Sequence, residues 1–143
     1  MHPFEELRNF FLHRIDEDLF YSAACCNVKM NQKLDTTLDR NTYDKLLAVK
    51  IFLVEMNRDC RIELNSTLST NHFQGLLHFF LEGIDEELIY LSNVCNAKMN
   101  QQMDTTYDKR IYAKLFAVRI FLDDKRRRSE TNNSRSLKRS RED

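Results

Sequence analysis

Glycine and proline are scarce in this chain, and tryptophan is missing. Its 143 residues include two Gly and one Pro, and they are 42% hydrophobic and 31% charged. This balance is normal for a globular protein, but it supplies few of the residues that make tight turns. We therefore expect an all-helical fold rather than a sheet. The length suits one domain or two small ones and is too short for large cofactor-binding architectures.

Long apolar runs are also lacking. No stretch reaches the roughly 18 apolar residues that a membrane span needs. The first ten residues, MHPFEELRNF, are acidic and lack the basic-then-apolar order of a signal peptide. We therefore expect an intracellular protein that has no membrane partner. Cys25, Cys26, Cys60 and Cys95 are then expected to be free thiols, because the cytosol and nucleus keep thiols reduced.

The motifs of common catalytic and cofactor sites are missing too. The cysteines lack the paired spacing of a zinc site, no His follows a Glu by three residues as in di-iron bundles, and both glycines lie outside any phosphate loop. Two acidic runs, IDEDL and IDEEL, are better explained as compensation of a helix dipole than as a catalytic dyad. We expect no enzyme activity, no metal and no cofactor.

Charge is distributed unevenly along the chain. The formal net charge is zero, but residues 1–124 carry a net charge of −5 and residues 125–141 a net charge of +7. Apolar residues are too few after Arg128 for this region to fold alone. The sequence therefore predicts a disordered basic tail over residues 129–143.

Two basic clusters in this region resemble a bipartite nuclear import signal. Their residues are Lys125, Arg126, Arg127, Arg128, Lys138, Arg139 and Arg141. The pattern predicts a nuclear protein with an import receptor as one partner. Two alternatives stay open: the tail only increases solubility, or it makes weak contacts with nucleic-acid phosphates that salt would weaken.

A nine-residue segment occurs twice in the chain. KMNQKLDTT at 29–37 returns as KMNQQMDTT at 98–106. When the chain is shifted by 69 residues, residues 10–53 match 79–122 at 26 of 44 positions without a gap. We interpret this match as a tandem duplication. It predicts a first repeat at 1–64, a polar connector at 65–71 and a second repeat at 72–128.

The hydrophobic spacing predicts three helices in each repeat. The first helices span about 3–14 and 71–82, and the third about 39–57 and 108–125. Asp16 and Asp85 are expected to cap the second helices, and Thr36 and Thr105 the third. The third helices are apolar around most of their circumference, so we expect them at the buried centre, on or near each other, in one six-helix domain with pseudo-twofold symmetry. The side chains expected to be inaccessible are Leu46, Val49, Leu53, Leu115, Val118 and Leu122.

Four polar residues are candidates for partner binding. Asn31 and Gln32 recur as Asn100 and Gln101, although helix capping does not need them. They would line a twofold-related groove, or they are relics of a recent duplication. The leading hypothesis is a non-enzymatic nuclear protein-interaction adaptor in a regulatory or chromatin-associated assembly. The alternative is a nucleic-acid-associated regulator that binds through its tail while the body forms a homodimer.

Overall fold

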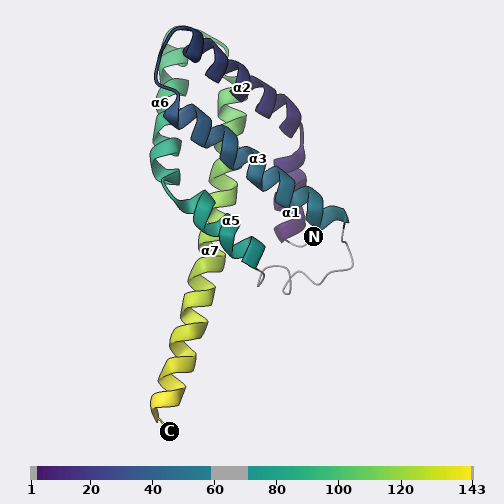
Figure 1. The fold of residues 1–143 in the computed structure, drawn as a ribbon, viewed down its shortest axis with the longest axis vertical. Helices are drawn as coiled ribbons and strands as arrows, with labels where there is room; N and C mark the ends of the chain where they lie inside the picture. The colour runs from purple at the N-terminus through teal and green to yellow at the C-terminus, as the bar shows by residue number, and fades with distance from the viewer. Residues whose placement is uncertain (1–2, 59–70, 143) are drawn as a thin grey trace.

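The regular structure of the described chain is helical throughout. The computed structural model describes the backbone of residues 3–58 and 71–142, and side chains within 4–55 and 73–128. Figure 1 shows the arrangement of the six helices in these ranges, and none of these residues forms a strand. The helices are α1 (Pro3–Leu12), α2 (Ile15–Asn31), α3 (Thr37–Arg58), α5 (Asn71–Leu81), α6 (Ile84–Asn100) and α7 (Thr106–Glu142). The prediction of an all-α helical bundle is confirmed.

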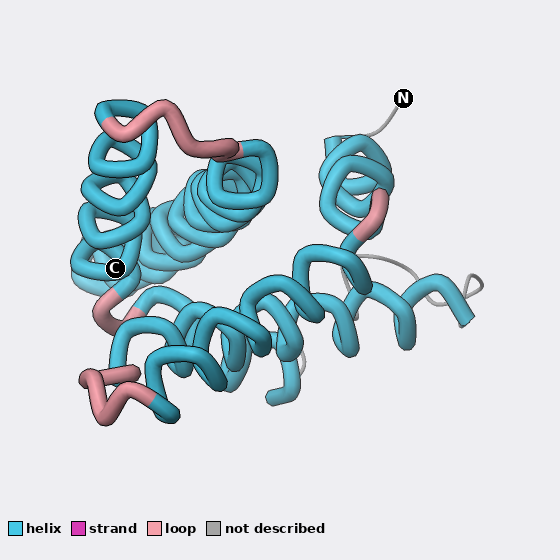
Figure 2. Tube along the Cα trace, turned by 90° about the horizontal axis from the view of Figure 1, so that it is seen from above, coloured by secondary structure: helices cyan, strands magenta, loops and turns pink. Residues whose placement is uncertain are grey.

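A residue in the left-handed backbone conformation immediately precedes α2, and another precedes α6. Arg14 (φ 57°) precedes α2 and Gly83 (φ 71°) precedes α6, and each makes a tight turn between two helices (Figure 2). The predicted caps, Asp16 and Asp85, are therefore wrong, because each helix begins one residue before its Asp. The two carboxylates lie in the first turn and form ion pairs, Asp16 with Lys50 and Asp85 with Arg119.

The repeated segment ends one helix with a Schellman motif. Lys33 adopts a left-handed conformation (φ 58°) and donates its N–H to Met30 O at 3.0 Å, while Leu34 donates to Lys29 O at 2.9 Å. The second copy repeats both bonds, with Gln102 (φ 58°) in the left-handed position. A polar sequence therefore recurs partly because it ends a helix in the same way.

The same segment begins the next helix. The Asp35 carboxylate accepts hydrogen bonds from the Thr37 N–H at 3.0 Å and from the Thr37 hydroxyl at 2.7 Å, and Asp104 does the same for Thr106. Thr36 was expected to supply the capping side chain. Its carbonyl accepts the first helical bond, from the Arg40 N–H at 2.9 Å, but the side-chain bonds observed at this turn come from Asp35.

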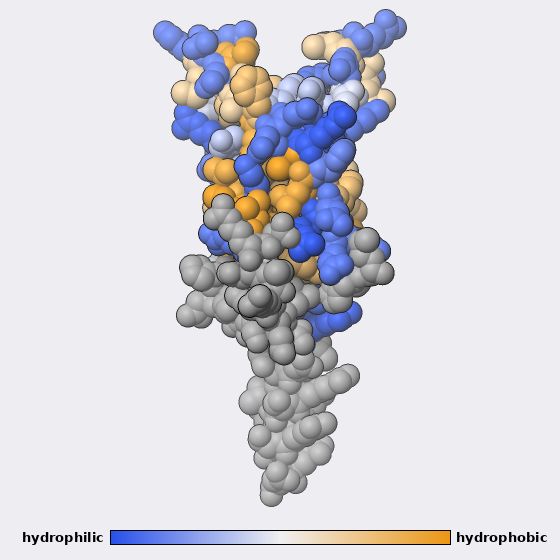
Figure 3. Space-filling view, turned by 90° about the vertical axis from the view of Figure 1, so that its right-hand side faces the viewer, coloured by the Kyte–Doolittle hydropathy of each residue, from blue (hydrophilic) through white to orange (hydrophobic). Residues whose placement is uncertain are grey.

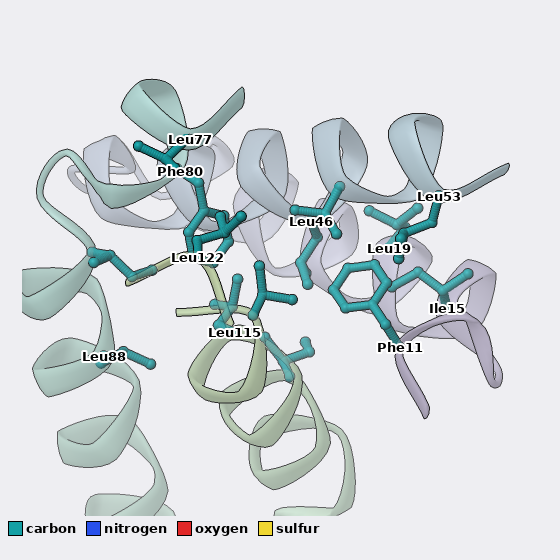
Figure 4. Close-up of a cluster of buried hydrophobic side chains, with 14 of the residues drawn as sticks. Phe11, Ile15, Leu19, Leu46, Leu53, Leu77, Phe80, Leu88, Leu115 and Leu122 are labelled. Carbon is teal, nitrogen blue, oxygen red and sulfur yellow. The ribbon is translucent and has the colours of Figure 1, made fainter. Parts of the chain in front are cut away.

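One apolar core joins all six helices. Figure 4 shows side chains from both halves of the chain meeting at its centre. The six residues that we expected to be inaccessible on the third helices are all at most 3% exposed, which confirms this prediction. Two aromatic contacts also join the first half to the second. The ring centroids lie 5.6 Å apart in Phe4–Phe121 and 5.9 Å apart in Phe52–Phe73.

The long third helices are central because each contacts both halves. α3 packs on α1 and α2 of its own half and also on α5 and α6, while α7 packs on α5 and α6 and also on α1 and α2. The two halves therefore share one hydrophobic core and do not form separate domains.

The helix α7 extends well beyond the body, to Glu142 (Figure 1). This differs from the predicted disordered tail over 129–143. The sequence offers one reason: no Gly or Pro follows Gly83, and Arg, Lys and Glu are good helix formers. Most of the predicted connector at 65–71 lies outside the described residues, and α5 begins at Asn71. In the described residues, no helix is long and apolar enough to cross a membrane.

Candidate functional site

A groove lies between α2 and α6. The α2–α3 and α6–α7 turns lie at the end of the molecule away from the C-terminus of α7 (Figure 1). In the side view this end divides into two arms with a hollow between them (Figure 3). The groove has a volume of about 400 Å³, within the range of about 300–1,000 Å³ that ligand pockets occupy. Most of its lining surface is apolar.

The apolar lining of the groove differs between its two sides. The lining includes the small residues Ala24 and Cys25 of α2, the larger Leu91 and Val94 of α6, and Ile111 of α7. The residues 69 positions away in sequence from these five are of other types. The lining of the groove is thus asymmetric.

A polar cluster of three residues also lines the groove. Lys29 of α2 donates hydrogen bonds to the Asp39 carboxylate of α3 at 3.0 and 3.2 Å and to the Tyr90 hydroxyl. The Tyr90 hydroxyl of α6 donates to Asp39 Oδ1 at 2.9 Å. This cluster therefore ties the α2–α3 arm to α6.

A matching cluster ties the α6–α7 arm to α2. Lys98 donates to Asp108 at 3.0 and 3.2 Å and to the Tyr21 hydroxyl at 2.5 Å, and that hydroxyl donates to both Asp108 oxygens at 3.1 Å. All three residues lie 69 positions after or before their counterparts in the first cluster. The Tyr21 ring also stacks on Tyr107, with centroids 4.9 Å apart.

The tyrosine and lysine side chains of both clusters stay protonated at neutral pH, because their pKa values are raised. Burial raises the pKa of Tyr21 to about 12, although its bond to Lys98 acts in the opposite direction. Burial lowers the pKa of Lys98, but its bonds to Tyr21 and Asp108 outweigh burial and leave the pKa above the usual value. The pKa values of Tyr90 and Lys29 rise for the same reasons. A protonated Lys and a neutral Tyr are poor nucleophiles and bases.

The four predicted partner-binding residues lie mostly outside the groove. Gln32 lines it, whereas the groove lining does not include Asn31, Asn100 or Gln101. Gln32 and Gln101 are the C-cap residues of α2 and α6, and all four side chains are exposed. The structure thus brings one of the four to the groove and gives the two glutamines a local role at helix ends.

Sequence reasoning missed a buried ion pair between the two halves. Lys114 of α7 is 1% exposed, and its ammonium lies 2.5 Å from the carboxylate of Asp18, which is fully buried. Lys114 also donates to the His13 carbonyl at 2.5 Å. Arg110 Nε donates to the other Asp18 oxygen at 2.7 Å. Asp18 belongs to the acidic run that we had assigned to the helix dipole.

A second buried pair occupies the equivalent place in the other half. Lys45 of α3 lies 2.5 Å from the carboxylate of Glu87 on α6 and donates to the Glu82 carbonyl at 2.5 Å. Burial raises the pKa of Glu87, while the hydrogen bonds from Lys45 and Asn41 offset part of that rise. A usable signal existed in the sequence, because Lys45 and Lys114 recur 69 residues apart within strongly apolar helices.

The cysteines described in the structure are mainly structural. Cys26 and Cys95 are each 8% exposed, as expected for core residues, and burial raises the pKa of both thiols. A raised thiol pKa disfavours the thiolate that acts as a nucleophile. Cys25 is free and half-buried beside the groove.

The first basic cluster of the predicted import signal lies on the exposed part of α7. Arg126 and Arg127 pair with Asp123 at 2.7 and 3.1 Å, and Arg128 pairs with Asp124 at 3.2 Å. Lys125 lies 5.3 Å from the centre of the Phe121 ring. The side chains of the second cluster, Lys138, Arg139 and Arg141, lie outside the described residues.

Among the described side chains, no group of three or more His, Cys, Asp or Glu residues could hold a metal ion. Comparison of the chain with protein-family models, with curated proteins and with solved structures finds no match.

Proposed function

We propose that this protein is a non-enzymatic, nuclear interaction adaptor, and that the groove between α2 and α6 binds an apolar segment of a protein partner. The observation that carries the proposal is the groove itself, which is large, open and mostly apolar. Its charged side chains pair within the protein, so they add no strong net charge to the binding surface. Such a surface suits apolar anchors of a partner better than a phosphate or a metal.

The asymmetry of the groove supports one partner segment in one orientation. The polar clusters are identical in the two halves, whereas positions such as Ser22 and Leu91, or Thr42 and Ile111, differ between them. We propose that the chain arose by tandem duplication of a three-helix unit into a pseudo-twofold domain, and that the groove then diverged for binding. The adaptor would act within a regulatory or chromatin-associated assembly.

A pair of matched variants tests the groove. Val28 lines it and is 55% exposed, whereas Ile51 is 49% exposed on α3 and is not part of its lining. Proteins captured from nuclear extract by the wild type should be lost with Val28→Glu and kept with Ile51→Glu, because a charge in the groove opposes burial of an apolar anchor. Equal capture by both variants would contradict the proposed site.

The basic end of α7 supplies the proposed route into the nucleus. Segment 129–143 has few apolar residues to bury, so we propose that it unfolds readily and that an import receptor binds the basic clusters at 125–128 and 138–141. Neutralising Lys125, the three arginines at 126–128, Lys138, Arg139 and Arg141 should abolish nuclear entry of a large fluorescent fusion. An unchanged distribution between nucleus and cytoplasm would refute this role of the tail.

A second candidate function uses the same tail. Residues 125–141 carry a net charge of +7, and α7 projects away from the body (Figure 1), which favours contact with nucleic-acid phosphates. In this alternative the body forms a homodimer. Binding of this kind should weaken steeply as salt rises, because each neutralised phosphate releases counterions. A fluorescence titration with generic duplex DNA at rising salt separates it from the adaptor, which needs no DNA affinity.

A further inference from the structure

The two halves of the body are joined crosswise by the buried ion pairs described above. Here the first half is residues 3–58 and the second half is residues 71–142. The Asp18 site consists of Asp18 from the first half with Lys114 and Arg110 from the second. The Glu87 site has the reverse origin, with Glu87 from the second half facing Lys45 and Asn41 from the first.

The two sites have the same plan but different side-chain lengths. In both, the lysine ammonium lies 2.5 Å from a carboxylate and 2.5 Å from a backbone carbonyl of the opposite half. The Asp18 site combines the shorter acid with the longer Arg110, whose Nε reaches Asp18 at 2.7 Å. The Glu87 site combines the longer acid with the shorter Asn41. In each site a long side chain thus compensates for a short one.

We propose that this compensation is a pairing code, so that each half fits the other half and rejects a copy of itself. Two first halves would bring Asp18 opposite Asn41, which leaves a buried carboxylate short of a donor. Two second halves would bring Glu87 opposite Arg110, and the extra methylene of Glu would have little room because the Glu87 side chain is 3% exposed and the Arg110 side chain 20% exposed. Specificity of this kind comes from penalties against the wrong partner as much as from contacts with the right one.

The kind of partner that this interface fits is therefore the complementary half. Within a single chain both sites are matched at once, so the chain closes on itself as a monomer. In a chain whose code is altered, neither site is matched within the chain. Both sites are then matched only when two chains pair, first half with first half and second half with second half. The inference does not depend on the groove or on the adaptor function.

Exchanges between the sites test the code, and the four proteins needed have the same composition. They are the wild type, the acid exchange Asp18→Glu with Glu87→Asp, the donor exchange Asn41→Arg with Arg110→Asn, and the quadruple variant with both exchanges. In each double exchange, the acid and the donor at both sites no longer fit each other within one chain. They fit when two chains pair through the same half, first with first or second with second. The quadruple variant restores matched sites within the chain.

The measurements are thermal unfolding by circular dichroism and molar mass by light scattering over a range of protein concentrations. We expect each double exchange to lower the melting temperature by about 4 °C or more and to form dimers as concentration rises. The quadruple variant should recover both the melting temperature and the monomer. Doubles that stay monomeric, or a quadruple variant no more stable than the doubles, would overturn the inference. If a double fails to fold, a folded monomeric quadruple variant supports the code and an unfolded one refutes it.

Discussion

Replacing Lys45 by Met should destabilise the protein more than replacing Lys114 by Met. The two lysines are equally buried, with side chains 4% and 1% exposed, and Met preserves most of their volume. Their partners differ in what remains after the change. Asp18 keeps the guanidinium of Arg110, whereas Glu87 keeps the neutral amide of Asn41, which is an exposed residue.

The magnitude follows from these remaining contacts. Removing one partner of a buried ion pair costs about 3–5 kcal/mol, because the other charge is left buried. Lys45→Met should lie in the upper part of that range, at about 4 kcal/mol. Lys114→Met should cost about 2 kcal/mol, since a charge-assisted hydrogen bond from Arg110 persists. At about 3 °C per kcal/mol for a chain of this size, the melting temperatures should fall by about 12 and 6 °C.

Urea unfolding, followed by circular dichroism at several pH values, measures these differences. Burial already holds the pKa of Glu87 above its usual value, and loss of Lys45 should raise it further. The folded Lys45→Met variant then binds a proton that the unfolded chain releases near neutral pH, so its unfolding free energy should rise as pH falls from 7 towards 5. Adding Glu87→Met should restore much of the stability, because an apolar pair replaces the unpaired charge.

A loss of unfolding free energy below about 1 kcal/mol for Lys45→Met would refute the reasoning, because removing one partner of a buried ion pair leaves the other charge buried and unpaired. The reverse order of the two variants would also refute it, since it would mean that Arg110 does not support Asp18.

Three further predictions concern the core, one groove cluster and one helix start. Leu53 is 2% exposed, so Leu53→Ala should lower the free energy of unfolding by about 2–5 kcal/mol, measured by calorimetry. A loss near zero would contradict a close-packed centre. Because the folded pKa of Tyr21 is about 12 and that of Lys98 is also raised, unfolding releases protons above pH 10, so stability should fall between about pH 10 and 12, and less steeply in Tyr21→Phe. The Thr37 bonds lower the pKa of Asp35, so the stability that they supply should be lost as pH falls below about 4, and Asp35→Ala should be less stable at pH 7 with a shallower acid dependence.

The core of the fold was predictable because hydrophobic spacing reports on burial within a helix. Leu46 and Leu115 recur at the same repeat position in the most apolar helices, and both are fully buried. The helix ends were harder to place. Left-handed residues at Arg14 and Lys33 set two of the turns, and neither residue type signals that conformation as glycine does at position 83.

The polar contacts between the halves could not be derived from local patterns. Asp18 looked like a residue of a first helical turn because its partner, Lys114, lies 96 residues further along the chain. The polar clusters of the groove were not predicted for the same reason, because Tyr21 and its hydrogen-bond partner Asp108 are 87 residues apart in the sequence. Lys114, Tyr21 and Asp108 are identical to the residues 69 positions away, and this identity was the signal that could have marked the contacts.

The proposed binding groove was only partly anticipated. The repeated Asn and Gln residues attracted notice because they are identical in both repeats, yet Gln32 alone lines the groove. The apolar groove positions, such as Ala24 and Val94, differ between the repeats and therefore did not stand out as a pattern. A surface whose residues differ between the two halves is hidden from a search for self-similarity.

Occupation of the groove by a partner segment is tested most directly by site-specific photo-crosslinking in intact nuclei. A photoreactive phenylalanine analogue is placed at Ala24 in the groove and, as a control, at the exposed Ile51 outside it. The adaptor account predicts a discrete adduct at position 24, mapped by mass spectrometry to one segment of one protein, and none of that adduct at position 51. No adduct at position 24, or the same adducts at both positions, would contradict it.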